Sequence, residues 1–226
     1  MKISQAAGNR EGHIGVAVES RFFNNLLNYI SNDDRFNQEL AEAKDEFQSV
    51  AGPIMETDRE YTARMNSFHN WYILDRPMRA LSITPLDYFL EFNANSLSAD
   101  ELEGYRELRE NVHSIFELLR RTRNHTWVQD LLTRRKFAVE GSEETDHIDP
   151  GALFNTRLFT HQSKNYFTNF LVPHPDSVSK AIKAQARKVR KHNGDPSAFV
   201  LQLVLYQSRW DQYWQMNPRN IYRFEA

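Results

Sequence analysis

Clusters of arginine are the side chains of this sequence with the clearest chemical potential. Arg120, Arg121 and Arg123 form one cluster, and Arg134 and Arg135 form a second. A guanidinium group donates hydrogen bonds in a planar fork that matches a phosphate group, so such clusters are typical of phosphate-binding surfaces. The alternative is a basic turn that is only solvated, which is the usual state of exposed charges.

A second basic feature is the segment 180–192, which contains six Lys/Arg residues and no acid. As a helix it can contact nucleic acid or an anionic membrane, but its apolar strip is thin and lacks Trp and Phe, which argues against membrane insertion. Phosphate contacts would make its binding salt-dependent. The alternative is a surface helix that lies opposite an acidic part of the chain. The candidate ligand-binding residues of this segment are Lys183, Arg187, Lys188, Arg190 and Lys191.

Motifs for catalysis or metal binding are not apparent. None of the eight histidines has H-x-x-x-H or H-E-x-x-H spacing. The chain has no cysteine, which excludes disulfides, thiolate zinc sites and cysteine nucleophiles. We therefore expect no catalytic residue, no metal site and no cofactor. An enzymatic function would require His69, Asp75 or Asp130 to converge in one pocket.

Aromatic residues are the third candidate group. The segment 68–77, FHNWYILDRP, is the most aromatic stretch of the chain. Because Trp and Tyr dominate protein-binding hot spots, we consider Trp71, Tyr72, Trp127 and Trp214 as candidate partner-binding residues. The alternative is that these side chains are buried and anchor helices on the rest of the fold.

Composition and charge limit the classes of protein to consider. Forty per cent of the 226 residues are hydrophobic, which is enough for a substantial core. No apolar run approaches the ~20 residues that span a bilayer, and the N-terminus lacks the apolar segment of a secretory signal. We therefore expect a cytoplasmic protein without membrane contact. Residues 1–112 contain 11 Lys/Arg and 19 Asp/Glu, whereas residues 113–226 contain 17 and 11, so the halves attract each other or the basic half faces a polyanion.

Apolar spacing of three to four residues predicts helices at both ends of the chain. Residues 1–15 lack this periodicity and are expected to form a flexible leader, followed by a helical region, 16–111, that opens with an antiparallel pair of helices. The capping signals are Asp33 or Asn32, Thr84 with Pro85, Ser98 with Glu101, and Asp195 with Pro196. Two helices are expected within residues 174–226.

The spacing changes to every second residue between Val112 and Pro173, which predicts short strands. The expected strands are His113–Arg120, His125–Leu131, Lys136–Glu140, Leu153–Thr160 and Tyr166–Val172. No parallel crossover is apparent, which favours a small antiparallel β-barrel or curled sheet. The predicted fold class is α+β, with a helical N-terminal arm, this β-module over 112–173 and two C-terminal helices, together forming one cooperative unit.

The central part of the chain, Phe68 to Pro173, resembles bacterial proteins that often carry a SEC-C motif. The segments that carry the resemblance are W-Y-I-L-D-R-P at 71–77, T-P-L-D-Y-F-L at 84–90, S-I-F-E-L at 114–118, W-V-Q-D-L-L-T at 127–133 and P-G-A-L-F-N-T-R-L at 150–158. The SEC-C motif itself is a cysteine-rich zinc hook, and it is absent here because the chain has no cysteine. The resemblance therefore implies a fold for the central module and no metal.

Two functions follow as hypotheses. The first is a non-catalytic binding or adaptor protein that contacts another protein through the rim of the β-module and its flanking aromatic residues. The second is binding of a phosphate-bearing ligand, either nucleic acid or a cyclic dinucleotide, through the arginine clusters and the basic segment. A barrel with such arginines resembles PilZ domains, which bind cyclic dinucleotides, but residues 130–135 lack the serine and glycine of the PilZ pattern.

Overall fold

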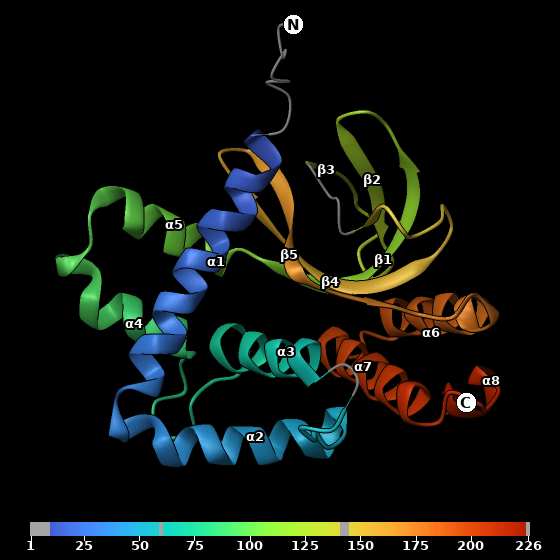
Figure 1. Cartoon of the computed structure of the whole chain (residues 1–226), viewed down its shortest axis with the longest axis horizontal. Coiled ribbons are helices and arrows are strands. Elements are labelled where there is room, and N and C mark those ends of the chain that lie inside the picture. Colours follow the sequence, from blue (N-terminus) through green and yellow to red (C-terminus); the bar gives the residue numbers. More distant parts are fainter. Residues whose placement is uncertain (1–9, 59–60, 141–144, 225–226) are drawn as a thin grey trace, which may run out of the picture.

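The computed structural model describes residues 10–58, 61–140 and 145–224 and forms an α+β fold, as predicted (Figure 1). The helices are α1 (Arg10–Ser31), α2 (Asn37–Ala51), α3 (Tyr61–Leu74), α4 (Pro85–Asn93), α5 (Ala99–Arg109), α6 (Ser179–Lys191), α7 (Pro196–Gln212) and α8 (Pro218–Ile221). The strands are β1 (Val112–Arg121), β2 (His125–Asp130), β3 (Lys136–Glu140), β4 (Leu153–His161) and β5 (Lys164–Pro173). No described helix combines the length and apolar character that crossing a bilayer requires.

The five strands close into a barrel in the order β1-β2-β3-β5-β4. Because β4 returns to pair with β1, strands β4, β1, β2 and β3 form a Greek key. The prediction of a purely antiparallel module was wrong for one pair of strands. Strands β3 and β5 are parallel where Val139 pairs with Asn165. Inside the barrel, alternate residues form a core in which the rings of Phe116, Phe154 and Phe167 lie 5.6 to 6.3 Å apart.

The helices cover one side of the barrel. Helices α1 and α3 pack on β5, α5 packs on β4, and α7 packs on β1, β4 and β5. Helix α7 also joins two apolar clusters, because Leu201 and Val204 face the N-terminal helices while Phe199 and Leu203 face α6 and the outside of the barrel. The helical arms and the barrel therefore share continuous cores.

The capping signals were reliable, whereas some helix ends and helix pairs differ from prediction. Asp33, Thr84, Ser98 and Asp195 each accept a hydrogen bond from a backbone N–H group at a helix start. Helix α1 begins at Arg10, so residues 10–15 belong to it and the rest of the predicted leader lies outside the described residues. Helices α1 and α2 meet at a corner instead of forming the predicted antiparallel pair (Figure 1).

A buried ion pair connects the barrel to the helices. Arg157 of β4 is fully buried, and its Nη1 donates to Asp75 Oδ1 at 3.0 Å and to Asn111 Oδ1 at 2.6 Å, while Nη2 donates to Asp75 Oδ2. Burial alone would raise the pKa of Asp75, but the charge of Arg157 and the neighbouring His113 hold this pKa well below its ordinary value. Asp75 directly follows α3, so the pair fixes the end of that helix on the barrel.

Asp130, in another of the segments that resemble SEC-C-type proteins, also has structural partners. Asp130 accepts a hydrogen bond from Ser114 Oγ at 2.5 Å, and it accepts two more from Leu132 N and Thr133 Oγ1 at 2.8 and 2.5 Å. Asp75 and Arg157 lie in two further segments of this group. These residues therefore stabilise turns and element contacts in this chain.

Gly104 marks a close approach between α5 and α1. A Cβ atom at this position of α5 would lie 2.1 Å from Cε2 of Phe22 in α1, far inside van der Waals contact. The ring of Phe22 also contacts Tyr105 with a centroid distance of 4.9 Å, so it has little freedom to move. A glycine within a helix normally costs about 1 kcal/mol relative to alanine.

We predict that Gly104→Ala destabilises the protein although it raises helix propensity. Overpacking a core typically costs about 1–3 kcal/mol, which exceeds the gain in propensity. Urea denaturation measures the change in the free energy of unfolding. Gly194→Ala is the matched control, because its nearest neighbour would lie at 3.4 Å, and a larger loss for Gly194→Ala than for Gly104→Ala would contradict the packing argument.

We also predict that Asp75→Asn lowers the free energy of unfolding by about 3 kcal/mol at pH 7, because it leaves the buried Arg157 charge without a carboxylate. Since the pKa of Asp75 is lowered in the folded state, its stabilisation is fully present above the unfolded pKa of about 3.9 and is lost as the pH falls below it. The difference between the two proteins should therefore shrink below about pH 4. Asp87→Asn, which breaks the exposed Asp87–Arg109 pair, should cost about 1 kcal/mol or less.

Candidate nucleic-acid interface

The barrel has one face without a helical cover. Helices pack along β1, β4 and β5, whereas no helix in the described part of the chain contacts β2 or β3 extensively (Figure 1). The outward side chains of these two strands include Trp127, which is half-buried, and Lys136, which is exposed. His125 and Glu140 bond to each other at 2.9 Å at one edge of this surface. We call the outer surface of β2 and β3, with the adjoining Arg120, the β2–β3 face.

A β-bulge decides which arginine of the first cluster joins this face. Leu118 pairs with Val128 and Arg120 pairs with Trp127, so Leu119 is an extra residue in β1. Strict alternation would place Arg120 on the same side as the buried Leu118. The extra residue turns Arg120 outward instead, and its guanidinium lies 5.0 Å from the centroid of the Trp127 ring.

The same bulge directs Arg121 toward the barrel. Its Nη2 donates to the carbonyl oxygens of Thr145 and Ile148, in the connection that precedes β4. Arg121, predicted as a ligand-binding residue, therefore has a structural role, because its Nη2 holds these two carbonyl groups. Arg123 lies exposed in the β1–β2 turn.

Helix α6 and the β2–β3 turn lie next to each other. Arg190 near the end of α6 donates to the carbonyl oxygen of Leu131, the residue that follows β2. The turn continues through Arg134, with φ of 67°, and Arg135, whose guanidinium lies 5.1 Å from the centroid of the Phe137 ring at the end of the barrel core. The second arginine cluster and the basic helix, predicted separately, thus form one neighbouring set.

Part of the basic helix serves the fold. Lys183 Nζ pairs with Glu117 Oε1 of β1 at 2.9 Å, and Arg190 holds Leu131, so these two side chains anchor α6 on the barrel. Ile182 and Ala186 are buried beneath them. Arg187, Lys188 and Lys191 are exposed. The alternative was a surface helix opposite the acidic N-terminal half; the contacts described for α6 are with α7 and the barrel.

The acidic residues of the β1–β3 region leave its exposed cations uncompensated. Between residues 112 and 140 the chain has six Lys/Arg and three Asp/Glu residues. Glu117 pairs with Lys183, Glu140 bonds His125, and Asp130 is buried in its turn. No described carboxylate forms a salt bridge with the exposed cations of this surface. These cations are Arg120, Arg123, Arg134, Arg135, Lys136, Arg187, Lys188 and Lys191.

Two of the four candidate partner-binding aromatics are unavailable. Trp71 is 7% exposed and Tyr72 is fully buried, because both face the core between the N-terminal helices. They therefore anchor the fold, as the alternative interpretation stated. Trp127 lies on the β2–β3 face, whereas Trp214, which is 71% exposed, follows α7. The predicted set does not form one aromatic surface.

The residues considered for an enzymatic site do not converge. Asp75 bonds Arg157 and Asp130 bonds Ser114, while the ring of His69 is tilted against that of Phe68 with a centroid distance of 5.3 Å. Burial lowers the pKa of His69. Within the described ranges, no group of three or more His, Cys, Asp or Glu side chains has the arrangement of a metal site.

Comparisons with models of protein families, with curated proteins and with solved structures found no match for this chain. The resemblance to SEC-C-type proteins therefore stays a prediction. The candidate interface is therefore inferred from the residues of the β2–β3 face and α6 alone. The structure adds Lys136 to the residues that the sequence predicted. Lys136 directly follows Arg134 and Arg135, and the alternation of side chains in β3 already indicated that it points outward.

We predict that Arg121→Met lowers the free energy of unfolding by about 1–3 kcal/mol, because two loop carbonyls lose their donor. Arg123→Met, in the neighbouring exposed turn, should change it by no more than about 0.5 kcal/mol. Chemical denaturation of both variants separates the structural arginine from the surface one. Equal effects would show that the inward position of Arg121 has no energetic consequence.

Proposed function

We propose that this protein is a non-catalytic binding protein whose β2–β3 face and basic helix bind single-stranded nucleic acid. The observation that carries the proposal is the contact of Arg190 with Leu131, which joins the exposed cations of α6 to those of the β2–β3 turn. From there the surface continues to Trp127 with Arg120 beside it. A polyanion laid along this path would meet cations at both ends and an indole between them.

The topology gives independent support by analogy. Five-stranded Greek-key barrels of the OB type bind oligonucleotides on the face of strands 2 and 3 and on the adjoining loops. The present barrel has the same number of strands, a Greek-key order and an uncovered β2–β3 pair. This analogy concerns the fold alone. The preference for one ligand over another must therefore be argued from the chemistry of the surface.

The chemistry of the surface favours a flexible strand over other phosphate ligands. An indole stacks on an unpaired base of any sequence, while exposed Lys and Arg side chains follow the backbone phosphates. A duplex would hide its bases from Trp127. A cyclic dinucleotide would need several arginines converging on one small ligand, but Arg121 is engaged by the carbonyl oxygens of Thr145 and Ile148. A protein partner at this face is the outcome to be distinguished by experiment.

Fluorescence anisotropy with a labelled single-stranded oligonucleotide tests the proposal. We expect the logarithm of the affinity to fall linearly with the logarithm of the salt concentration, by about 0.7 per phosphate contact. Arg123→Ala and Arg134→Ala should each reduce this slope by about 0.7. Trp127→Ala should weaken binding by about 1–3 kcal/mol at every salt concentration, because it removes stacking and leaves the phosphate contacts in place.

Trp214→Ala is the matched control, since it removes an exposed indole away from the β2–β3 face and should leave the affinity unchanged. A duplex of the same length and a cyclic dinucleotide complete the ligand series. Absence of binding at about 50 mM salt, where phosphate contacts are strong, would exclude the proposal. Equal losses for Trp127→Ala and Trp214→Ala would also contradict it.

A further inference from the structure

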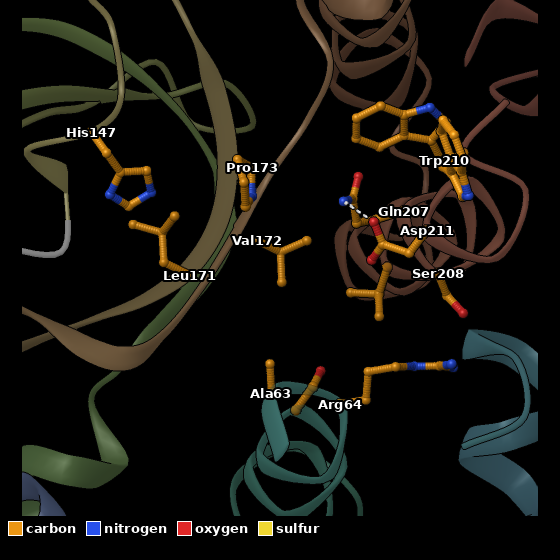
Figure 2. A pocket seen from close by; sticks show the side chains of 13 residues that line it. Ala63, Arg64, His147, Leu171, Val172, Pro173, Gln207, Ser208, Trp210 and Asp211 are labelled. Atoms are coloured by element: carbon orange, nitrogen blue, oxygen red, sulfur yellow. Dashed lines mark hydrogen bonds between the residues drawn. The ribbon is translucent and has the colours of Figure 1, made fainter. Parts of the chain in front are cut away.

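An indole ring and a carboxylate come together both in a pocket on the helical side of the molecule and on the β2–β3 face. The pocket, of about 670 Å³, lies between α3, the end of β5 and α7. Figure 2 shows Gln207, Trp210 and Asp211 of α7 on one side of it. On the β2–β3 face the corresponding residues are Trp127 and Glu140.

The polar groups of the pocket are already paired with one another. Gln207 Nε2 donates to Asp211 Oδ1 at 3.2 Å, and the hydroxyl of Tyr222 donates to Gln207 Oε1 at 2.9 Å. The charge of Asp211 also acts on Arg64 of the same lining, which donates to Asp58 Oδ2 at 2.8 Å. A polar group selects a ligand best where the protein leaves part of its hydrogen-bonding capacity unused. The paired groups of this pocket therefore serve the fold.

The carboxylate of Glu140 has a different environment. His125 Nε2 lies 2.9 Å from its Oε1, whereas Oε2 receives no hydrogen bond from the described part of the chain. An ionised carboxylate has about four acceptor positions on its two oxygens, so one contact leaves most of this capacity unused. The side chain of Glu140 is 19% exposed, and a ligand on the β2–β3 face can reach it.

The strand register places Glu140 diagonally next to the indole. His125 pairs with Glu140 and Trp127 pairs with Ala138, so the outward residues of β3 are Lys136, Ala138 and Glu140 in this order. Ala138 lies opposite the indole and contributes only a methyl group. Lys136 and Glu140 lie on the two diagonals, at Cα separations of about 7–8 Å, which long side chains can bridge. A ligand stacked on the indole therefore has a cation at one end and a carboxylate at the other.

These charges determine how a nucleotide lies on the face. Its phosphates are attracted to Lys136 and to Arg120, whose guanidinium lies 5.0 Å from the centroid of the Trp127 ring. Glu140 repels a phosphate, so it is the edge of the base that approaches this carboxylate. A base stacked on Trp127 therefore presents its polar edge to an acceptor.

Guanine is the base whose edge matches a carboxylate. Its N1–H and its N2 amino group are adjacent donors, and together they can donate to the two oxygens of one carboxylate. Cytosine and adenine place a ring-nitrogen acceptor beside their amino group. Thymine and uracil have a carbonyl oxygen on each side of N3–H. Each of these other edges brings a lone pair toward the carboxylate and is disfavoured.

We propose that the β2–β3 face prefers a guanine base, which stacks on Trp127 and donates from N1 and N2 to the carboxylate of Glu140. This inference rests on the proposed function, because the guanine belongs to the bound single strand. Glu140 determines the base preference, whereas the cations and the indole supply affinity that does not depend on sequence.

Fluorescence anisotropy with labelled oligothymidylates of about ten nucleotides, a length within the range of one such barrel, tests the base preference. One central nucleotide is replaced by dG, dA or dC. We expect the dG strand to bind at least about 5-fold more tightly than the others, the lower end of what a bidentate contact with a base provides. A strand with deoxyinosine, which lacks the N2 amino group, should bind between the dG and dA strands. A strand with 7-deazaguanine, whose N1 and N2 donors are unchanged, should bind as the dG strand does.

Equal binding of the dG and dA strands would overturn the proposal. So would equal binding of the dG and deoxyinosine strands, because the contact would then not involve N2. Weaker binding of the 7-deazaguanine strand would place the contact on the other edge of the base and would also overturn it.

A variant locates the contact. Glu140→Gln should bring the affinities for the dG and dA strands within about 2-fold of each other, because an amide has a single acceptor oxygen. Its affinity for the unsubstituted oligothymidylate should stay the same or rise, since a negative charge is removed. Glu103→Gln, at an exposed acid of α5, is the matched control and should keep the preference. Thermal unfolding verifies that both variants are folded, and the base series on the unaltered protein decides the matter if Glu140→Gln is not. A preference that persists in folded Glu140→Gln would exclude this carboxylate.

The outcomes separate this inference from the proposed function. Absence of binding for every strand at about 50 mM salt would remove the proposed function, whereas binding without a base preference would remove only the inference. The affinity for each strand should fall as salt rises, but the ratio of the dG to the dA affinity should stay constant, because a contact with a base releases no counterions. A ratio that falls with the overall affinity would contradict the contact with Glu140.

Discussion

The contact of Arg157 with Asp75 is the constraint on which the arrangement of the molecule depends. A guanidinium without solvent access is tolerated only where carboxylate and amide oxygens meet its donors, and here they come from the end of α3 and from Asn111 before β1. Three segments distant in sequence must therefore stay together. The helical arm and the barrel are joined by polar geometry as well as by the apolar clusters around α7.

This attachment determines which barrel surface is left for ligands. With β4 and β5 facing the helices and β1 partly covered by α7, the strands β2 and β3 form the open side. The bulge at Leu119 then adds Arg120 to that side and removes Arg121 from it. A one-residue insertion in the strand pairing thus separates a surface cation from a structural one.

The β2–β3 face and the pocket beside α7 differ in chemical character. The exposed cations of the β2–β3 face and α6 form no salt bridge with a described carboxylate, whereas the pocket beside α7 is lined by a carboxylate, an amide and two indoles. Helix α7 and the barrel lie between them.

The sequence by itself determined the features that depend on neighbours along the chain. The period of the apolar residues located five strands, including Lys136–Glu140 with both ends correct, and side-chain caps such as Thr84 and Asp195 marked helix starts. These signals are local, because a strand face or a cap is defined within a few residues.

Only the tertiary structure decided what each candidate side chain contacts. It buried Trp71 and Tyr72, engaged Arg121 and Lys183, and brought α6 to the β2–β3 turn. It also brought Asn155, His174, Tyr222 and Gln207 into one chain of hydrogen bonds. Each outcome depends on partners tens of residues away, and composition and periodicity contain no information about which distant groups meet.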